Sequence, residues 1–241
     1  MKSRSGISQL TEFIVNCQSI VFFGGAGVST ESGLPDFRGA EGLYNIAPEE
    51  ILSYRFFIRN PKEFYDFYSS NLVRLDVLPN EAHLALKELE YMGKDITVIT
   101  QNIDGLHHIA GSKKVIELHG TIHRNFCLEC GKEFNALYIK EKHTCDDCNG
   151  LIRPGAVMYG EKLDDLVVEE AIEKIQEAEL MIVAGTSLKV YPAAGMLRYF
   201  DGKKLVIINS EPTSKDSLAD LVIKEKIGEV MKQVMELFKR E

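Results

Sequence analysis

Four cysteines form the pattern in this chain that is most typical of a metal site. They are arranged as two C-x-x-C pairs, Cys127 with Cys130 and Cys145 with Cys148, separated by fourteen residues. In a reducing compartment this pattern indicates metal binding and not disulfides. Four thiolates suit a closed tetrahedral zinc ion, which has no open position for a substrate. We therefore predict a structural zinc site.

A glycine-containing turn, Gly25-Ala26-Gly27, follows the apolar run at residues 19–23. Between a strand and the start of a helix, such a turn lets backbone N–H groups approach a diphosphate closely. Thr30 stands at the third glycine position of the dinucleotide fingerprint, and no acidic residue ends a second strand about twenty residues further on. The turn therefore indicates nucleotide binding more than a purely structural role. It lacks the third glycine and the distant acidic residue that are typical of a dehydrogenase.

Two further segments place polar side chains directly after apolar runs. Gln101, Asn102 and Asp104 follow one run, and His119 follows another. Amides and carboxylates at the carboxyl edge of a strand can hydrogen-bond a ribose or a carboxamide, but Asn102 or Asp104 in this place can also cap a helix. A histidine at such an edge can act as a general base because its pKa lies near neutrality. Taken alone, His119 fits a structural role at least as well.

Two loops carry less specific signals. Asp36-Phe37-Arg38 combines an acid, an aromatic ring and a guanidinium in a segment without periodicity. Such a loop can be functional, and it can also be a surface turn with a buried ring. Gly185-Thr186-Ser187 closes the apolar run at 180–184 and is a second candidate for contact with a nucleotide.

The elements that must position these residues alternate along the chain. We predict buried strands at residues 19–23, 96–100, 180–184 and 205–208, and helices at 7–17, 81–91, 166–178 and 227–240. Alternating strands and helices indicate an α/β fold with a parallel sheet, in which ligands bind at the carboxyl ends of the strands. The segments at 49–75, with a helix start at Asn60-Pro61, and at 126–152 interrupt the alternation and predict a smaller inserted module.

Composition limits the remaining possibilities. The chain has 241 residues and a net charge of −8, with a pI near 5.4. An acidic protein is not expected to bind nucleic acid through general phosphate contacts. No run of about eighteen apolar residues predicts a membrane span, and residues 1–9 lack the apolar segment of a secretory signal. We therefore expect a cytoplasmic protein. We also expect Cys17 and His83 to be buried core residues.

In combination, these motifs resemble the sirtuin family from about Val21 to Glu211. The matching stretches, in order, are Gly-Ala-Gly-Val-Ser at 25–29, Ser-Gly-Leu-Pro-Asp-Phe-Arg at 32–38, Thr-Gln-Asn-Ile-Asp at 100–104, His119-Gly120, the two C-x-x-C pairs, Gly160-Glu161, Gly-Thr-Ser-Leu at 185–188, and Asn209. Each match is modest by itself, and their joint presence is highly specific.

The resemblance implies a Rossmann-like, NAD-binding domain made of residues 1–39, 78–125 and 153–241. It also implies a small domain, in which residues 40–77 form a helical insert and residues 126–152 form the zinc ribbon. NAD would lie in the cleft between the two domains.

The resemblance also assigns roles to individual residues. It implies that His119 is the catalytic base, that Asn102 is also catalytic, and that Asp104 holds the carboxamide of NAD. The residues it assigns to contacts with NAD are Ala26, Thr30, Phe37, Arg38, Gln101, Asn102, Ile103, Asp104, His119, Thr186, Ser187, Asn209 and Ile227.

The activity implied is that of an NAD-dependent protein-lysine deacetylase, with NAD as co-substrate. The acyl oxygen attacks the anomeric carbon as nicotinamide leaves, and His119 then takes a proton from a ribose hydroxyl, which attacks the resulting amidate. Water then frees the lysine, so the products are lysine, nicotinamide and O-acetyl-ADP-ribose. Acetylated peptides are expected to bind by β-augmentation between the loops at 155–161 and 187–191, and no partner that is a nucleic acid or a membrane is expected.

Several positions depart from the family pattern. Gly24 stands where many members have threonine, and Met158-Tyr159 stands where the peptide-binding loop usually has two aromatic residues. Desuccinylating relatives carry a Tyr and an Arg three residues apart in the helical insert. This chain has Tyr68 but Asn71 in the Arg position, which predicts neutral acyl groups, above all acetyl.

The alternatives on the same fold are a mono-ADP-ribosyltransferase and a deacylase for longer neutral acyl groups. A dehydrogenase with structural zinc and a non-catalytic zinc-ribbon module are less well supported by these motifs.

Overall fold

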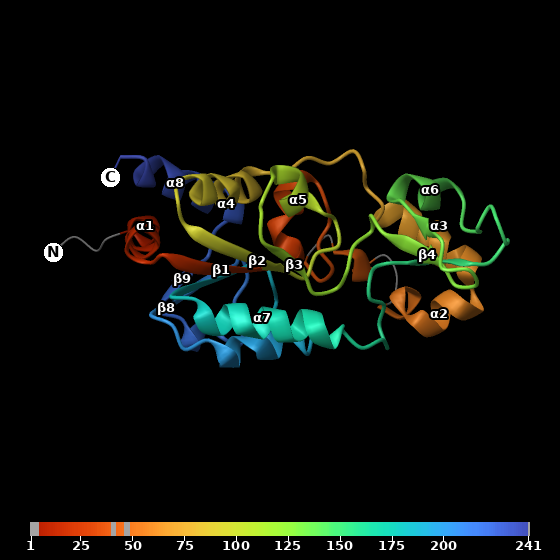
Figure 1. Cartoon of the computed structure of the whole chain (residues 1–241). Helices are drawn as coiled ribbons and strands as arrows, with labels where there is room; N and C mark the ends of the chain where they lie inside the picture. Colours follow the sequence, from red (N-terminus) through yellow and green to blue (C-terminus); the bar gives the residue numbers. More distant parts are fainter. Residues whose placement is uncertain (1–4, 40–41, 46–48, 241) are drawn as a thin grey trace.

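A computed structural model describes residues 5–39, 42–45 and 49–240. Its main element is a six-stranded parallel sheet in the order β3-β2-β1-β7-β8-β9 (Figure 1). The strands of this sheet are β1 (Ser19–Gly24), β2 (Asp95–Thr100), β3 (Val115–Glu117), β7 (Leu180–Ala184), β8 (Lys204–Ile208) and β9 (Leu221–Ile223). The predicted α/β class is therefore confirmed.

Helices cover both faces of this sheet. They are α1 (Gly6–Asn16), α4 (Glu81–Tyr91), α5 (Leu106–Ala110), α7 (Asp165–Glu177) and α8 (Ile227–Phe238). Residues of α1, α4 and α8 pack with Ile20 and Phe22 on one face, whereas α7 and a 3₁₀ segment at Ala193–Tyr199 pack with Val21 and Phe23 on the other. Figure 1 shows α7 on the side of the sheet opposite α4 and α8. Because both faces are buried, most of the strands have nearly continuous apolar sequences, such as Leu180–Ala184.

A second group of elements lies at the end of the molecule away from the termini (Figure 1). It comprises a three-stranded sheet in the order β5-β4-β6, and three helices. These elements are β4 (Asn125–Cys127), β5 (Glu133–Phe134), β6 (Ile152–Pro154), α2 (Tyr54–Arg59), α3 (Pro61–Asn71) and α6 (Ala136–Glu141). They share one apolar core, in which the rings of Phe57, Phe64 and Tyr65 contact one another edge to face. The exact domain boundaries stay a prediction, and residues 40 and 41, at one of them, lie outside the described residues.

The predicted elements agree with the structure to within one or two residues. The predicted helix start at Asn60-Pro61 is confirmed, with Pro61 in the first turn of α3. One expectation was wrong. The glycine turn leads into two short 3₁₀ segments, Ala26–Val28 and Thr30–Ser32, and not into an α-helix. The second segment ends at Gly33, whose positive φ of 88° breaks the helical path.

Cys17 and His83 are buried, as predicted. Within residues 5–39, 42–45 and 49–240, no helix has the length and apolar character that crossing a bilayer requires.

Candidate active site

A cavity of about 740 Å³ lies where the strands of the six-stranded sheet end. Its lining includes the segments that directly follow β1, β2, β7 and β8, so it occupies the edge at which parallel sheets bind ligands. The volume is in the range of small-molecule sites. All the residues assigned to NAD by sequence line this single cavity: Ala26, Thr30, Phe37, Arg38, Gln101, Asn102, Ile103, Asp104, His119, Thr186, Ser187, Asn209 and Ile227.

The glycine turn packs directly on the turn that follows β7. Gly27 N–H donates to the Gly185 carbonyl at 2.8 Å, and Gly25 N–H donates to the Ala184 carbonyl at 3.0 Å. A Cβ atom on Gly25 would lie 2.8 Å from the Gly185 oxygen, and one on Gly27 would lie 2.8 Å from Gly185 Cα. Glycine is therefore required at both positions because the two backbones approach each other closely. This requirement holds whether or not a ligand also approaches the turn.

A buried hydrogen-bond network joins this turn to the segment after β2. Ser29 Oγ donates to Asp104 Oδ2 at 2.7 Å, and Asn102 Nδ2 donates to Ser29 Oγ at 3.1 Å. Asp104 Oδ1 also accepts from Leu106 N–H at 2.9 Å. Burial raises the pKa of Asp104, while these donors oppose the shift. The network holds Asn102 and Asp104 in fixed orientations. Ser29 belongs to the Gly-Ala-Gly-Val-Ser motif, but its role in the site is not evident from the sequence.

His119 has the tautomer that a general base needs. Its Nδ1 lies 2.8 Å from the Gln101 carbonyl oxygen. A carbonyl can only accept, so Nδ1 carries the hydrogen and Nε2 keeps its lone pair. Burial lowers the pKa of His119 below its ordinary value, so the imidazole is neutral near pH 7. A neutral imidazole in the cavity can therefore take a proton from a bound hydroxyl at Nε2.

This protonation state predicts the pH profile of catalysis. Acid removes the base as pH falls through the folded-state pKa of His119, which burial holds below its ordinary value. We expect kcat/KM of a reaction that uses His119 as its base to stay level from about pH 8 to neutrality and to fall only below the ordinary histidine pKa of about 6.5. Initial rates at subsaturating substrate, measured between about pH 5 and 8, check this. An acid limb centred above pH 7 would contradict a burial-lowered pKa.

Phe37 and Arg38 lie on a loop that folds back against two tyrosines. The Arg38 guanidinium lies 5.0 Å from the centre of the Tyr44 ring and 3.5 Å from a carboxylate oxygen of Glu49. The rings of Phe37 and Tyr44 are 5.5 Å apart, and the hydroxyls of Tyr44 and Tyr159 form a hydrogen bond. The loop thus brings an apolar ring and a cation to the cavity wall.

The far end of the cavity is lined by the turns after β7 and β8 and by the start of α8. Gln101 Nε2 donates to Thr186 Oγ1 at 3.2 Å, which links this end to the His119 end. Glu31 Oε2 accepts from Gly228 N–H at 2.6 Å and so caps α8 beside Ile227. Sequence reasoning missed Glu31, since nothing local signals a contact between residues 197 positions apart.

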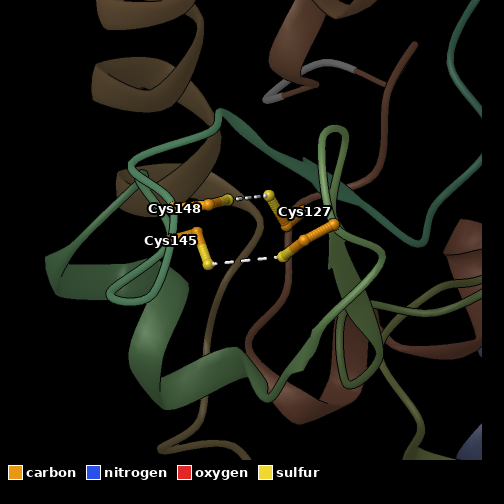
Figure 2. A group of neighbouring side chains, drawn as sticks. Cys127, Cys145 and Cys148 are labelled. Carbon is orange, nitrogen blue, oxygen red and sulfur yellow. Dashed lines mark hydrogen bonds between the residues drawn. The ribbon is translucent and has the colours of Figure 1, made fainter.

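The four predicted cysteines converge in the smaller group of elements, away from the cavity lining. All four sulfurs lie within 4.8 Å of one another, with Cys127 and Cys148 sulfurs 3.4 Å apart and Cys130 and Cys145 sulfurs 3.7 Å apart (Figure 2). A tetrahedral zinc with Zn–S bonds of about 2.3 Å requires sulfurs about 3.8 Å apart. The cluster therefore fits a structural zinc ion with no open position.

His143, the nearby histidine, is not part of this cluster. Its ring stacks on Tyr65 with the centroids 3.9 Å apart.

The model of the Sir2 family matches residues 25–192. The chain is 48% identical to an NAD-dependent protein deacetylase from Clostridium acetobutylicum and 50% identical to one from Clostridium perfringens, in each case over 95% of this chain and 98% of the relative. Its fold is similar to a solved Sir2 variant with a deacetylated p53 peptide and 3'-O-acetyl ADP ribose. The TM-score is 0.90 at 40% identity, over 96% of this chain and 98% of the other.

Proposed function

The chain belongs to the Sir2 family, and on that premise we infer that it is an NAD-dependent protein deacetylase that removes acetyl groups from lysine side chains. NAD is the co-substrate, and the products are deacetylated lysine, nicotinamide and O-acetyl-ADP-ribose. The observation that carries this inference is the neutral His119 imidazole, with Nε2 unprotonated, in the same cavity as the glycine turn and Asp104.

In this reaction NAD supplies the electrophilic ribose carbon, and the protein supplies position and one base. Asp104 and Asn102, held by Ser29, orient the nicotinamide end. His119 Nε2 takes the proton of a ribose hydroxyl so that the hydroxyl oxygen can attack the acyl carbon, and water then frees the lysine. Phe37 covers the reacting carbon and keeps water from it.

We propose that the acetylated peptide binds as an added strand between residues 155–161 and 187–191. Two features support this. The N–H groups of Gly160 and Lys189 donate no hydrogen bond to any described residue, so they are available to a peptide backbone. Arg153 makes an ion pair with Glu161 at 3.1 Å, and Glu161 accepts from Met158 N–H at 2.8 Å, which holds residues 158–161 in a turn closed by the hydrogen bond from Glu161 N–H to the Met158 carbonyl.

The residues fit a zinc-stabilised enzyme of a reducing compartment. Four clustered thiols remain available to a metal only where they are not oxidised to disulfides. We therefore propose that the protein acts in the cytoplasm, with NAD bound between the Rossmann-like domain and the small domain. Neither nucleic acid nor a membrane is a proposed partner, given the net charge of −8.

The test is to incubate the protein with NAD and an acetyl-lysine peptide and to follow the products by mass spectrometry. We expect equal amounts of deacetylated peptide, nicotinamide and O-acetyl-ADP-ribose. The same peptide carrying succinyl-lysine should react more slowly, because Asn71 offers no positive charge for a carboxylate. Radiolabel from NAD that becomes attached to protein, without O-acetyl-ADP-ribose, would instead indicate a mono-ADP-ribosyltransferase and would contradict the proposal.

A further inference from the structure

A hydrogen bond between two tyrosine hydroxyls joins the loop that carries Phe37 to the loop at residues 155–161. Its partners are Tyr44 and Tyr159, whose ring centroids lie 6.5 Å apart with the rings tilted by 55°. Both side chains are half-buried. Of the two, only Tyr159 lines the cavity. Any effect of Tyr44 on a bound ligand must therefore pass through the groups that Tyr44 contacts.

Tyr159 is the fixed partner of the pair, because its backbone is hydrogen-bonded on both sides. Its N–H donates to the Leu52 carbonyl at 3.1 Å, and its carbonyl accepts from Tyr54 N–H at 3.0 Å. These two bonds form a short parallel bridge with Ser53. The Tyr159 ring also packs against the apolar core that the smaller sheet and its helices share. Its hydroxyl is thus presented from a well-anchored residue.

Tyr44 in turn holds the segment that carries Phe37. Tyr44 N–H donates to the Phe37 carbonyl at 3.1 Å, and Leu43 N–H donates to the Asp36 carbonyl at 2.9 Å. The contacts of the Tyr44 ring with the Phe37 ring and the Arg38 guanidinium add side-chain packing to this backbone pairing. A displacement of Tyr44 therefore displaces Phe37 as well.

The hydrogen bond between the two hydroxyls matters more for position than for stability. Burial raises the pKa of Tyr44, and the hydrogen bond to Tyr159 raises it further, so the Tyr44 hydroxyl stays neutral. A half-buried neutral hydroxyl can exchange its protein partner for water at little cost. A water molecule, however, does not hold the Tyr44 ring next to Tyr159. Loss of either hydroxyl should leave the protein folded and allow Tyr44 and Phe37 to move.

We propose that Tyr44 and Tyr159 are positioning residues whose hydrogen bond keeps Phe37 over the reacting ribose carbon. The inference rests on the proposed function, which assigns Phe37 to that carbon and residues 155–161 to the peptide. The hydrogen bond ties the loop that binds the peptide to the ring that excludes water. It acts through Phe37 and makes no contact with the reacting atoms.

A competing reaction reports on the position of Phe37. When the ring moves aside, the oxygen of a water molecule bonds to the ribose carbon, and the carbon–nitrogen bond to nicotinamide breaks. Nicotinamide leaves with the electron pair of that bond, and the water loses one proton to solvent. The products are nicotinamide and ADP-ribose, and the peptide keeps its acetyl group. Nicotinamide released in excess of deacetylated peptide therefore measures the failure to exclude water.

The experiment follows both products in one sample, at early times, with NAD and an acetyl-lysine peptide. For the wild type we expect nearly equal amounts of nicotinamide and deacetylated peptide. In Tyr44→Phe and in Tyr159→Phe, the excess of nicotinamide per deacetylated peptide should rise by about threefold to tenfold, the range expected for one neutral hydrogen bond. Free ADP-ribose, identified by mass, should account for the excess. Tm should stay close to that of the wild type.

The double variant separates this hydrogen bond from two independent effects. Each single substitution removes the same bond, so the variant with both substitutions should release no more excess nicotinamide than either single variant. Tyr54→Phe is the matched control. Tyr54 does not line the cavity, its side chain is 37% exposed, and its ring packs on Phe57 with the centroids 6.1 Å apart. This control should keep the product ratio of the wild type.

An unchanged product ratio in both single variants would overturn the inference, and so would effects that multiply in the double variant. An equal rise in Tyr54→Phe would also overturn it, because the effect would then not depend on the Tyr44–Tyr159 hydrogen bond. A wild type that releases no deacetylated peptide would overturn the proposed function instead.

Discussion

Replacing His119 with alanine is expected to lower kcat/KM for deacetylation by about a hundredfold to ten-thousandfold, which is the usual contribution of a positioned general base. The reason is specific to its geometry. The Gln101 carbonyl holds the hydrogen on Nδ1, and burial keeps the ring neutral, so Nε2 is a ready acceptor that no other group replaces in the variant. Deacetylated peptide, separated by mass, measures the loss.

The same substitution should spare an earlier step. If His119 removes a ribose proton only after nicotinamide has departed, single-turnover release of nicotinamide in the presence of acetylated peptide should stay within a few-fold of wild type. A variant that loses nicotinamide release to the same degree as deacetylation would show that His119 acts before the bond to nicotinamide breaks.

His108→Ala is the matched control for this prediction. His108 does not line the cavity, its side chain is 52% exposed, and its nearest charged partner is Glu117 at 3.7 Å. Deacetylation by this variant should match the wild type. If His119→Ala retained wild-type activity, the assignment of the base would be wrong, whatever the control showed.

The parts of the fold that could be predicted are those with strong local patterns. The helix Glu81–Tyr91 and the strand Leu180–Ala184 have the predicted bounds. The helix is preceded by Asn80, whose side chain caps its first turn. The strand is a fully apolar five-residue run that is buried on both faces of the sheet. The strand ends then bring the polar residues after them to one edge, which is why the predicted NAD residues line a single cavity.

What sequence reasoning missed depends on contacts between distant residues. Strand β9, Leu221–Ile223, has only three residues, and its pairing with β8 decides its conformation. Ser29 and Glu31 take their roles from Asp104 and from the start of α8, far along the chain. The Tyr68 hydroxyl has no hydrogen-bond partner among the described residues, and this too cannot be predicted from the sequence, because the fold decides which groups surround it.

Replacing Cys145 with serine is expected to remove the metal and to lower Tm by more than about 10 °C. Binding of structural zinc contributes about 10–16 kcal/mol in zinc-finger peptides, and each kcal/mol moves Tm by about 2–4 °C in a chain of this size. Cys145 is fully buried and its sulfur lies 3.7 Å from that of Cys130. Metal analysis of purified protein should give one zinc per wild-type chain and almost none in Cys145→Ser.

The effect of losing zinc should extend to catalysis, although the cysteines lie outside the cavity lining. Cys127 and Cys145 belong to the same apolar core as Phe64 and Tyr68, which line the cavity from α3. Loosening that core therefore disturbs the part of the cavity wall that α3 forms. Cys17→Ser is the control, because Cys17 is a buried cysteine outside the cluster and its loss should keep both zinc and activity. Stoichiometric zinc in Cys145→Ser, or full activity after its loss, would contradict this coupling between the metal site and the cavity.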